Sequence, residues 1–198
     1  SITNAVTVTI SNFLNGAVIG NVTVDNAGAT VYCGGAITGN VVVTNGLFYP
    51  FNITISGTTN VAAAGTWTLG GTNTAVGEVT LAGALNLSSA TVLDCSVPLR
   101  VTASTAAVNW GQGDILGGFN AAGYTVAHTN TGAGSTLTCD VAGTLDLGGT
   151  ATGVPINVTA ATTASGTWTA GTVTATAGAT TLADGANITA NFVGAGGT

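Results

Sequence analysis

Hydrophobic and polar residues alternate with a period of two along most of this chain. The alternating runs occur at residues 6–10, 22–24, 53–55, 66–69, 79–81, 85–87, 145–147 and 172–174. Beta-branched and aromatic residues are frequent in these runs, and turn dipeptides such as Asn45-Gly46 and Asp184-Gly185 separate them. Helix signals are scarce, because methionine is absent and 31 glycines interrupt the sequence. The pattern predicts an all-β protein built of short strands.

A repeat of about 19 residues underlies the alternation. Residues 16–24 and 35–43 have closely similar sequences and are offset by this interval. Asn21, Asn40, Asn60 and Glu78 continue the series, so we expect them to lie above one another. The interval is the length of one coil of a β-solenoid, in which short strands stack on those of neighbouring coils. A β-sandwich is the alternative architecture, but it explains the alternation without explaining the repeat.

A longer and more degenerate repeat lies over the short one. Three segments share the pattern Pro-x-x-[Ile/Val]-Thr, starting at Pro50, Pro98 and Pro155. Each is preceded by one of the three cysteines and followed by one of the three tryptophans, Trp67, Trp110 and Trp168. We therefore predict a single domain over residues 1–198 with three supermotifs, at about 16–70, 78–117 and 118–198. The tryptophans are interpreted as packing residues rather than as a carbohydrate-stacking ladder.

The charge content excludes several partners. Only 4% of the residues are charged, Arg100 is the single basic residue, and the formal net charge is −6. Such a surface cannot neutralise phosphates, which argues against nucleic acid and anionic membranes as partners. No apolar run approaches the roughly 18 residues that a transmembrane helix needs. A neutral polar surface favours association, so the expected partner is a further copy of the chain.

These features are typical of a secreted protein. The chain begins at Ser1 without a signal-like segment, which we interpret as a mature chain whose signal peptide has been removed. Five Asn-x-Ser/Thr sequons are candidate glycosylation sites: Asn21, Asn52, Asn86, Asn157 and Asn187. The expected location is extracellular or at the cell surface.

Three cysteines, Cys33, Cys95 and Cys139, leave at least one without a partner in the same chain. No Cys-x-x-Cys spacing suggests a metal site, and neighbouring aspartates disfavour a thiolate nucleophile. His128 precedes Cys139 at some distance in the sequence, which is weak support for a catalytic pair. Two interpretations remain open, buried small hydrophobic residues and disulfides between subunits.

Catalytic and cofactor signals are weak. The acids are scattered along the chain, at Asp25, Glu78, Asp94, Asp114, Asp140, Asp146 and Asp184. A glycine-rich segment at 111–118 lacks the tandem repeats of a calcium-binding solenoid. We therefore predict no enzyme activity, no cofactor and no metal site.

The composition resembles that of a known group of proteins. Near-absence of lysine and arginine, a bias toward glycine, threonine, asparagine and valine, and few cysteines are similar to the tubular sheath proteins of methanogenic archaea. More broadly, the chain resembles β-solenoid surface and filament proteins. This resemblance covers the whole chain but rests on no motif, so it transfers no functional residue. It implies a β-rich protein that stacks into an insoluble, disulfide-reinforced envelope.

The leading hypothesis is an extracellular structural protein that self-assembles into a filament, sheath or surface layer. Residues 1–5 and 194–198 are small and neutral, so nothing opposes edge-to-edge strand pairing through segments near 1–15 and 185–198. The alternative is a surface binding module, either an adhesin or an ice-binding face built from repeated Thr-x-Thr segments. A carbohydrate-active enzyme is less favoured.

Overall fold

The computed structural model describes residues 7–10, 18–87, 91–109, 113–120, 124, 127–129, 137–139, 143–146, 156–158, 162–165, 167–175, 180–182, 184–194 and 196. Side chains are described over residues 20–87, 91–109, 113, 115–120, 124, 172–175, 181–182, 184–194 and 196. All regular secondary structure in these ranges is β-strand, as the alternation predicted.

The strands in chain order are β1 (Thr7–Ile10), β2 (Val18–Ile19), β3 (Val22–Ile37), β4 (Val41–Ile55), β5 (Thr59–Leu69), β6 (Thr72–Ala75), β7 (Val79–Leu81), β8 (Ala84–Leu87), β9 (Val92–Cys95), β10 (Leu99–Val101), β11 (Ala107–Asn109), β12 (Asp114–Leu116), β13 (Phe119–Asn120), β14 (Ala127–Thr129), β15 (Leu137–Cys139), β16 (Gly143–Asp146), β17 (Ile156–Val158), β18 (Thr162–Ser165), β19 (Thr167–Ala175), β20 (Thr180–Leu182) and β21 (Asn187–Gly194). The longest of them, β3, β4 and β5, bend through corners of the coil and so contribute to more than one sheet face.

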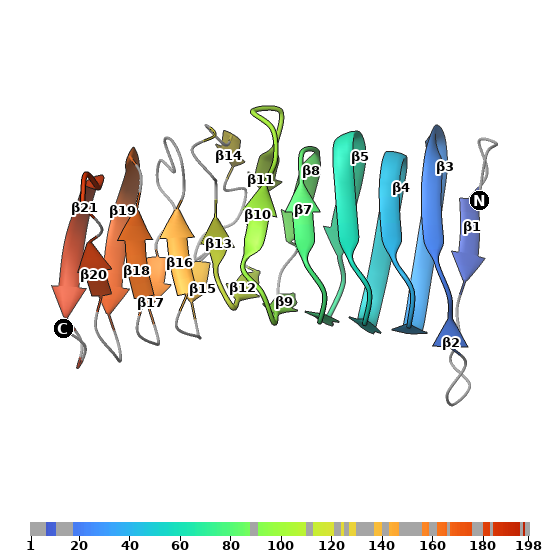
Figure 1. Cartoon of the computed structure of the whole chain (residues 1–198), viewed down its shortest axis with the longest axis horizontal. Coiled ribbons are helices and arrows are strands. Elements are labelled where there is room, and N and C mark those ends of the chain that lie inside the picture. The colour runs from blue at the N-terminus through green and yellow to red at the C-terminus, as the bar shows by residue number, and fades with distance from the viewer. Residues whose placement is uncertain are drawn as a thin grey trace.

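Each coil contributes three strand segments, which pair with the equivalent segments of the neighbouring coils. In the coil formed by residues 41–58 these segments are 41–43, 47–50 and 53–55. We call the three resulting stacks the first, second and third faces. Every strand pairing among the described residues is parallel, for example that of β3 with β4 and of β4 with β5. Figure 1 shows the strands side by side in a stack, with β1 at one end and β21 at the other.

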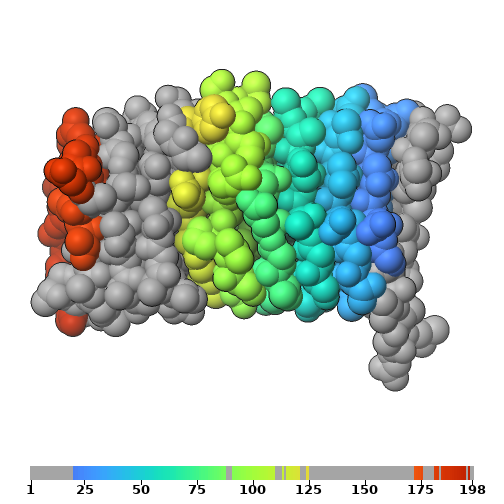
Figure 2. All heavy atoms as spheres, viewed as in Figure 1, coloured from blue at the N-terminus to red at the C-terminus, as the bar shows by residue number. Residues whose placement is uncertain are grey.

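The pairing register of the first face confirms the predicted coil length. A continuous column of paired residues runs through Thr23, Val42, Asn60, Thr80, Arg100, Asn120, Asp146 and Ser165. Every step in this column is close to the predicted interval except the step from Asn120 to Asp146, which is longer. The protein is therefore a β-solenoid with coils of about 19 residues. Successive coils appear as parallel bands of colour in Figure 2.

The core is a stack of inward-pointing side chains, one or two from each face of each coil. On the second face Val31, Phe48, Trp67, Leu85 and Val108 lie in consecutive coils, and each is fully buried. Burying a side chain of this size contributes about 1.5–3 kcal/mol. The complete burial of Trp67 confirms its predicted packing role.

The third face continues the same packing with smaller residues. Ile37, Ile55, Ala75 and Cys95 form one inward column, in which every side chain is at most 2% exposed. Narrow coils of this kind favour valine, isoleucine, alanine and cysteine, which pack without strain in a confined space.

Asparagine side chains bridge successive coils at the corner before the first face. Asn21 Oδ1 accepts a hydrogen bond of 2.8 Å from the backbone N–H of Asn40, and Asn40 Oδ1 accepts one of 2.9 Å from the N–H of Thr58. The backbone N–H of Thr59 in turn donates to the carbonyl of Glu78. Each side chain therefore satisfies a backbone donor that the corner would otherwise leave without a partner.

This register corrects one predicted position. Asn21, Asn40 and Glu78 occupy the same corner in successive coils, as expected, but the residue between Asn40 and Glu78 is Thr58 and not Asn60. Asn60 lies further along the chain, paired with Val42 and Thr80 on the first face. The error arises because the coil lengths vary slightly, which the sequence interval alone does not resolve.

The prolines of the first two predicted supermotifs lie on different parts of a coil. Pro50 pairs with Cys33 on the second face and is buried, whereas Pro98 lies at the corner just before β10 on the first face. The Pro-x-x-[Ile/Val]-Thr pattern of these two supermotifs therefore does not mark one fixed point of the coil. Pro155 and Trp110 lie outside the described residues.

Glycine at the Asn corner provides the first test of this stacking. A Cβ added to Gly57 would lie 2.6 Å from the carbonyl carbon of Gly39 in the coil below, whereas a Cβ on Gly20 would have no atom within 4 Å. We expect Gly57→Ala to destabilise the protein by about 1–3 kcal/mol, because the coils must move apart to admit the methyl group. Gly20→Ala, at the equivalent corner position, should leave the unfolding midpoint nearly unchanged. Equal midpoints for the two variants in denaturant unfolding would contradict the coil-to-coil contact.

Candidate functional site

The last described coil exposes residues from columns that are buried elsewhere. Leu99 and Phe119 are fully buried on the first face, and the backbone register places Leu145, Ala164 and Leu182 at the same position in the following coils. Leu182 is 54% exposed. Its exposure follows from its place in the stack, because β18 is the only described strand that pairs with β20.

The third face repeats this arrangement at the same end. Val173 is buried, and its pairing partner in the next coil, Phe192, is 55% exposed. Ile188 and Ala190 pack against the core and are only partly buried. Among the described strands, β21 pairs with β19 alone. Leu182 and Phe192, together with the free edges of β20 and β21, are called the end surface below.

The opposite end of the stack presents a matching set of strand edges. β1 pairs with β3 from Thr7 opposite Thr30 to Ile10 opposite Cys33, and β2 pairs with β3 through Val18 and Ile19. Over the described residues, β3 is the only strand paired with β1 or β2. Both ends of the stack therefore carry parallel strand edges with the same chain direction.

The structure describes the side chains of two of the three cysteines. Cys33 and Cys95 are buried free thiols, on the second and third faces. Burial raises the pKa of the Cys33 thiol to about 11. Burial, with a smaller effect from the negative charge of Asp94, raises the pKa of the Cys95 thiol to about 12. The side chain of Cys139 lies outside the described residues, so an inter-subunit disulfide stays a prediction and now concerns this residue.

The ionisable groups do not form a catalytic constellation in the described part of the chain. Arg100 Nε lies 2.9 Å from Glu78 Oε1, and both side chains are about half exposed. A surface ion pair of this kind contributes at most about 1 kcal/mol. Among the residues with described side chains, no three His, Cys, Asp or Glu residues are close enough to hold a metal ion. The described stretches also contain no helix with the length and apolarity to cross a membrane.

The sequons lie on several parts of the coil. Asn21 and Asn52 are exposed corner residues whose side-chain oxygens accept backbone hydrogen bonds from the next coil. Asn86 donates a hydrogen bond of 3.0 Å from Nδ2 to Thr68 Oγ1 and is partly buried, while Asn187 is exposed in β21. The side chain of Asn157 lies outside the described residues. Glycosylation of these residues stays a prediction.

Threonines of successive coils stack on one another in only part of the described solenoid. On the second face Thr66 and Thr68 are stacked next to Leu47, Tyr49, Ala84 and Asn86, so no regular threonine array forms there. On the first face Thr144, Thr163 and Thr181 occupy one register column. The extended, regular array that would favour ice binding is therefore absent from the second face over residues 30–86.

Comparison of the chain with protein-family models, curated proteins and solved structures gave no match.

The buried thiols generate a second prediction. Alkylation requires the thiolate, and a raised pKa together with burial keeps Cys33 and Cys95 protonated and inaccessible at pH 8. We expect iodoacetamide to modify neither residue in the folded protein and both in guanidinium chloride, as measured by peptide mass spectrometry. The unfolded thiols ionise near pH 9 and the folded ones only near 11 to 12, so stability should fall as the pH rises above 9. Rapid labelling of either residue in the folded state would contradict this placement.

Proposed function

We propose that the protein is an extracellular structural subunit that assembles end to end into a filament, sheath or surface layer. The observation that carries this proposal is the exposure of Leu182 and Phe192, which stand in columns whose other members with described side chains are buried. A further coil placed over them would bury the exposed half of each side chain, contributing about 1 kcal/mol each, roughly half of the value for full burial. The first coil of a second copy would be such a coil.

The backbone supports the same contact. An edge strand presents unpaired N–H and C=O groups that template another strand unless charge, proline or a cap blocks them. Because the strands at the two ends run in the same direction, the parallel ladder continues when β21 of one copy meets β1 and β2 of the next and β20 meets residues 22–24 of β3. Such a head-to-tail contact is heterologous, and it generates open filaments when the rotation does not close into a ring.

Few ionisable side chains lie near the two ends, so charge repulsion does not oppose this contact. Residues 1–24 contain no ionisable side chain. At the other end, Asp184 is the only ionisable side chain from 147 to 198. A single carboxylate facing an uncharged end gives no like-charge repulsion across the junction. The extracellular part of the proposal is supported by the five sequons and by the resemblance in composition to secreted envelope proteins.

The third prediction tests the end surface with a matched pair of variants. Leu182 is 54% exposed in the end surface, and Val97 is 45% exposed on the side of the solenoid. We expect the full chain to form large assemblies at micromolar concentration in sedimentation velocity. Leu182→Glu should prevent assembly and leave a monomer of about 18.9 kDa, because burying an unpaired carboxylate at the junction between copies is costly.

Val97→Glu makes the same change in net charge and should assemble like the unmodified chain. A stable monomer of the unmodified chain, or equal loss of assembly in both variants, would overturn the proposed function.

A further inference from the structure

Aromatic side chains gather on the outer surface of the second face, beginning in the coil next to β1. Tyr32 and Tyr49 are paired residues of successive coils, with ring centroids 5.4 Å apart and planes inclined at 49°. Tyr32 is 40% exposed and the neighbouring Phe51 is 50% exposed. Tyr32, Tyr49 and Phe51 are called the aromatic patch.

The backbone of Gly70 in the next coil lies close to two of these rings. A Cβ on Gly70 would lie 2.7 Å from Phe51 Cδ2 and 2.9 Å from Tyr49 Cε1, so both rings lie directly against the Gly70 backbone. Residue 70 can be only glycine without displacing them. Tyr49 therefore packs between Tyr32 and the Gly70 backbone, which restricts its ring and lowers the entropic cost of binding.

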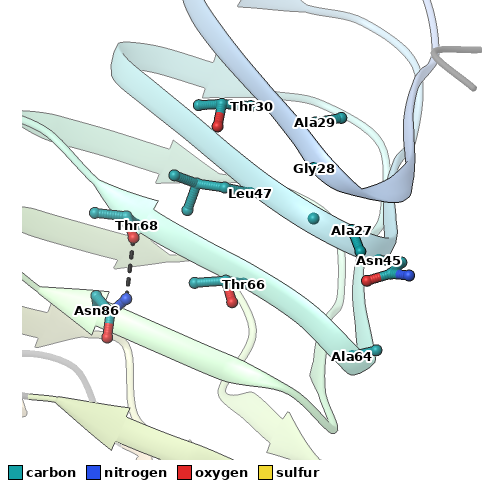
Figure 3. Close-up of a pocket in the computed structure, with 11 residues that line it drawn as sticks. Ala27, Gly28, Ala29, Thr30, Asn45, Leu47, Ala64, Thr66, Thr68 and Asn86 are labelled. Atoms are coloured by element: carbon teal, nitrogen blue, oxygen red, sulfur yellow. Dashed lines mark hydrogen bonds between the residues drawn. The ribbon is translucent and has the colours of Figure 1, made fainter. Parts of the chain in front are cut away.

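Polar side chains continue the same surface column along the solenoid axis. Thr68 follows the Phe48–Trp67 pair by one position, as Tyr49 does, and it pairs with Asn86, which pairs with Asn109. Thr68 and Asn86 also line a shallow depression of about 440 Å³, together with Thr30, Asn45, Leu47 and Thr66. Figure 3 shows that these side chains come from successive coils and that the hydrogen bond joins Asn86 to Thr68.

The surface has the chemistry of a neutral ligand site. None of the residues lining the depression is charged, and the aromatic patch adds only tyrosine and phenylalanine. Phosphate, carboxylate and ammonium groups would therefore find no counter-charge. Exposed rings beside amide and hydroxyl groups fit a sugar, which has an apolar C–H face and a rim of hydroxyl groups.

We propose that the second face binds an extended, uncharged polysaccharide lying along the solenoid axis. Its sugar rings stack on Tyr32 and Tyr49, and its hydroxyl groups bond to Thr68 and Asn86. The distance from Tyr32 to Asn86 spans three coil steps, or about 15 Å, which accommodates several sugars of one chain. This binding does not require assembly, because the surface lies on the side of the solenoid and leaves both ends free.

Isothermal titration calorimetry of the full chain with cellohexaose tests the proposal, with hexagalacturonate as a charged comparison. We expect cellohexaose to bind and hexagalacturonate to give no heat. Tyr32→Ala should weaken cellohexaose binding by about tenfold or more, and Tyr32→Trp, which keeps a stacking ring, should restore it.

Tyr124→Ala is the matched control, because Tyr124 is 39% exposed and lies outside the aromatic patch and the depression. It should bind cellohexaose like the unmodified chain, and all three variants should keep the unmodified thermal midpoint. Absence of cellohexaose binding would overturn the proposal, as would equal losses in Tyr32→Ala and Tyr124→Ala. A Tyr32→Ala variant with altered sedimentation and unchanged sugar binding would instead assign the patch to contacts between copies.

Discussion

The parallel backbone ladder between successive coils is the interaction on which this structure depends. Each coil satisfies its N–H and C=O groups with the coil before and the coil after it, so every coil must return the chain to the same register. The first-face column from Thr23 to Ser165 shows that the chain does so repeatedly. Core packing follows, because a common register places residues such as Phe48 and Trp67 directly above one another.

Differences in length between successive coils occur at the corners, outside the paired strand segments. The segment 26–29 separates Asp25 from Thr30, but only Gly46 separates their partners Asn45 and Leu47. The first of these coils therefore has a longer corner while its faces stay in register. At the corner before the first face, the side chains of Asn21 and Asn40 accept hydrogen bonds from backbone N–H groups of the next coil. Variation in coil length is thus confined to positions where side chains or solvent can complete the hydrogen bonding.

The contrast between regular faces and variable corners explains which features the sequence could predict and which it could not. Alternation and the repeat interval were sufficient for the solenoid, since both arise from geometry that every coil repeats. The stacked tyrosines were missed because the corner before Tyr49 is shorter than the corner before Tyr32, so their separation in the sequence falls below the repeat interval. Leu182 and Phe192 look like ordinary core residues in the sequence, and only the stacking order shows that no described coil covers them.

The same ladder connects fold and proposed function, because an edge that pairs with the next coil can pair equally with the next molecule. The two proposals assign separate roles to the ends and the sides of the solenoid, assembly to the ends and sugar binding to the second face. Fibre diffraction from aligned assemblies of the full chain tests the central claim most directly. Continuation of the ladder predicts a spacing of about 4.8 Å along the long axis of the assembly. The same spacing perpendicular to that axis would contradict the account, because the molecules would then associate through their sides.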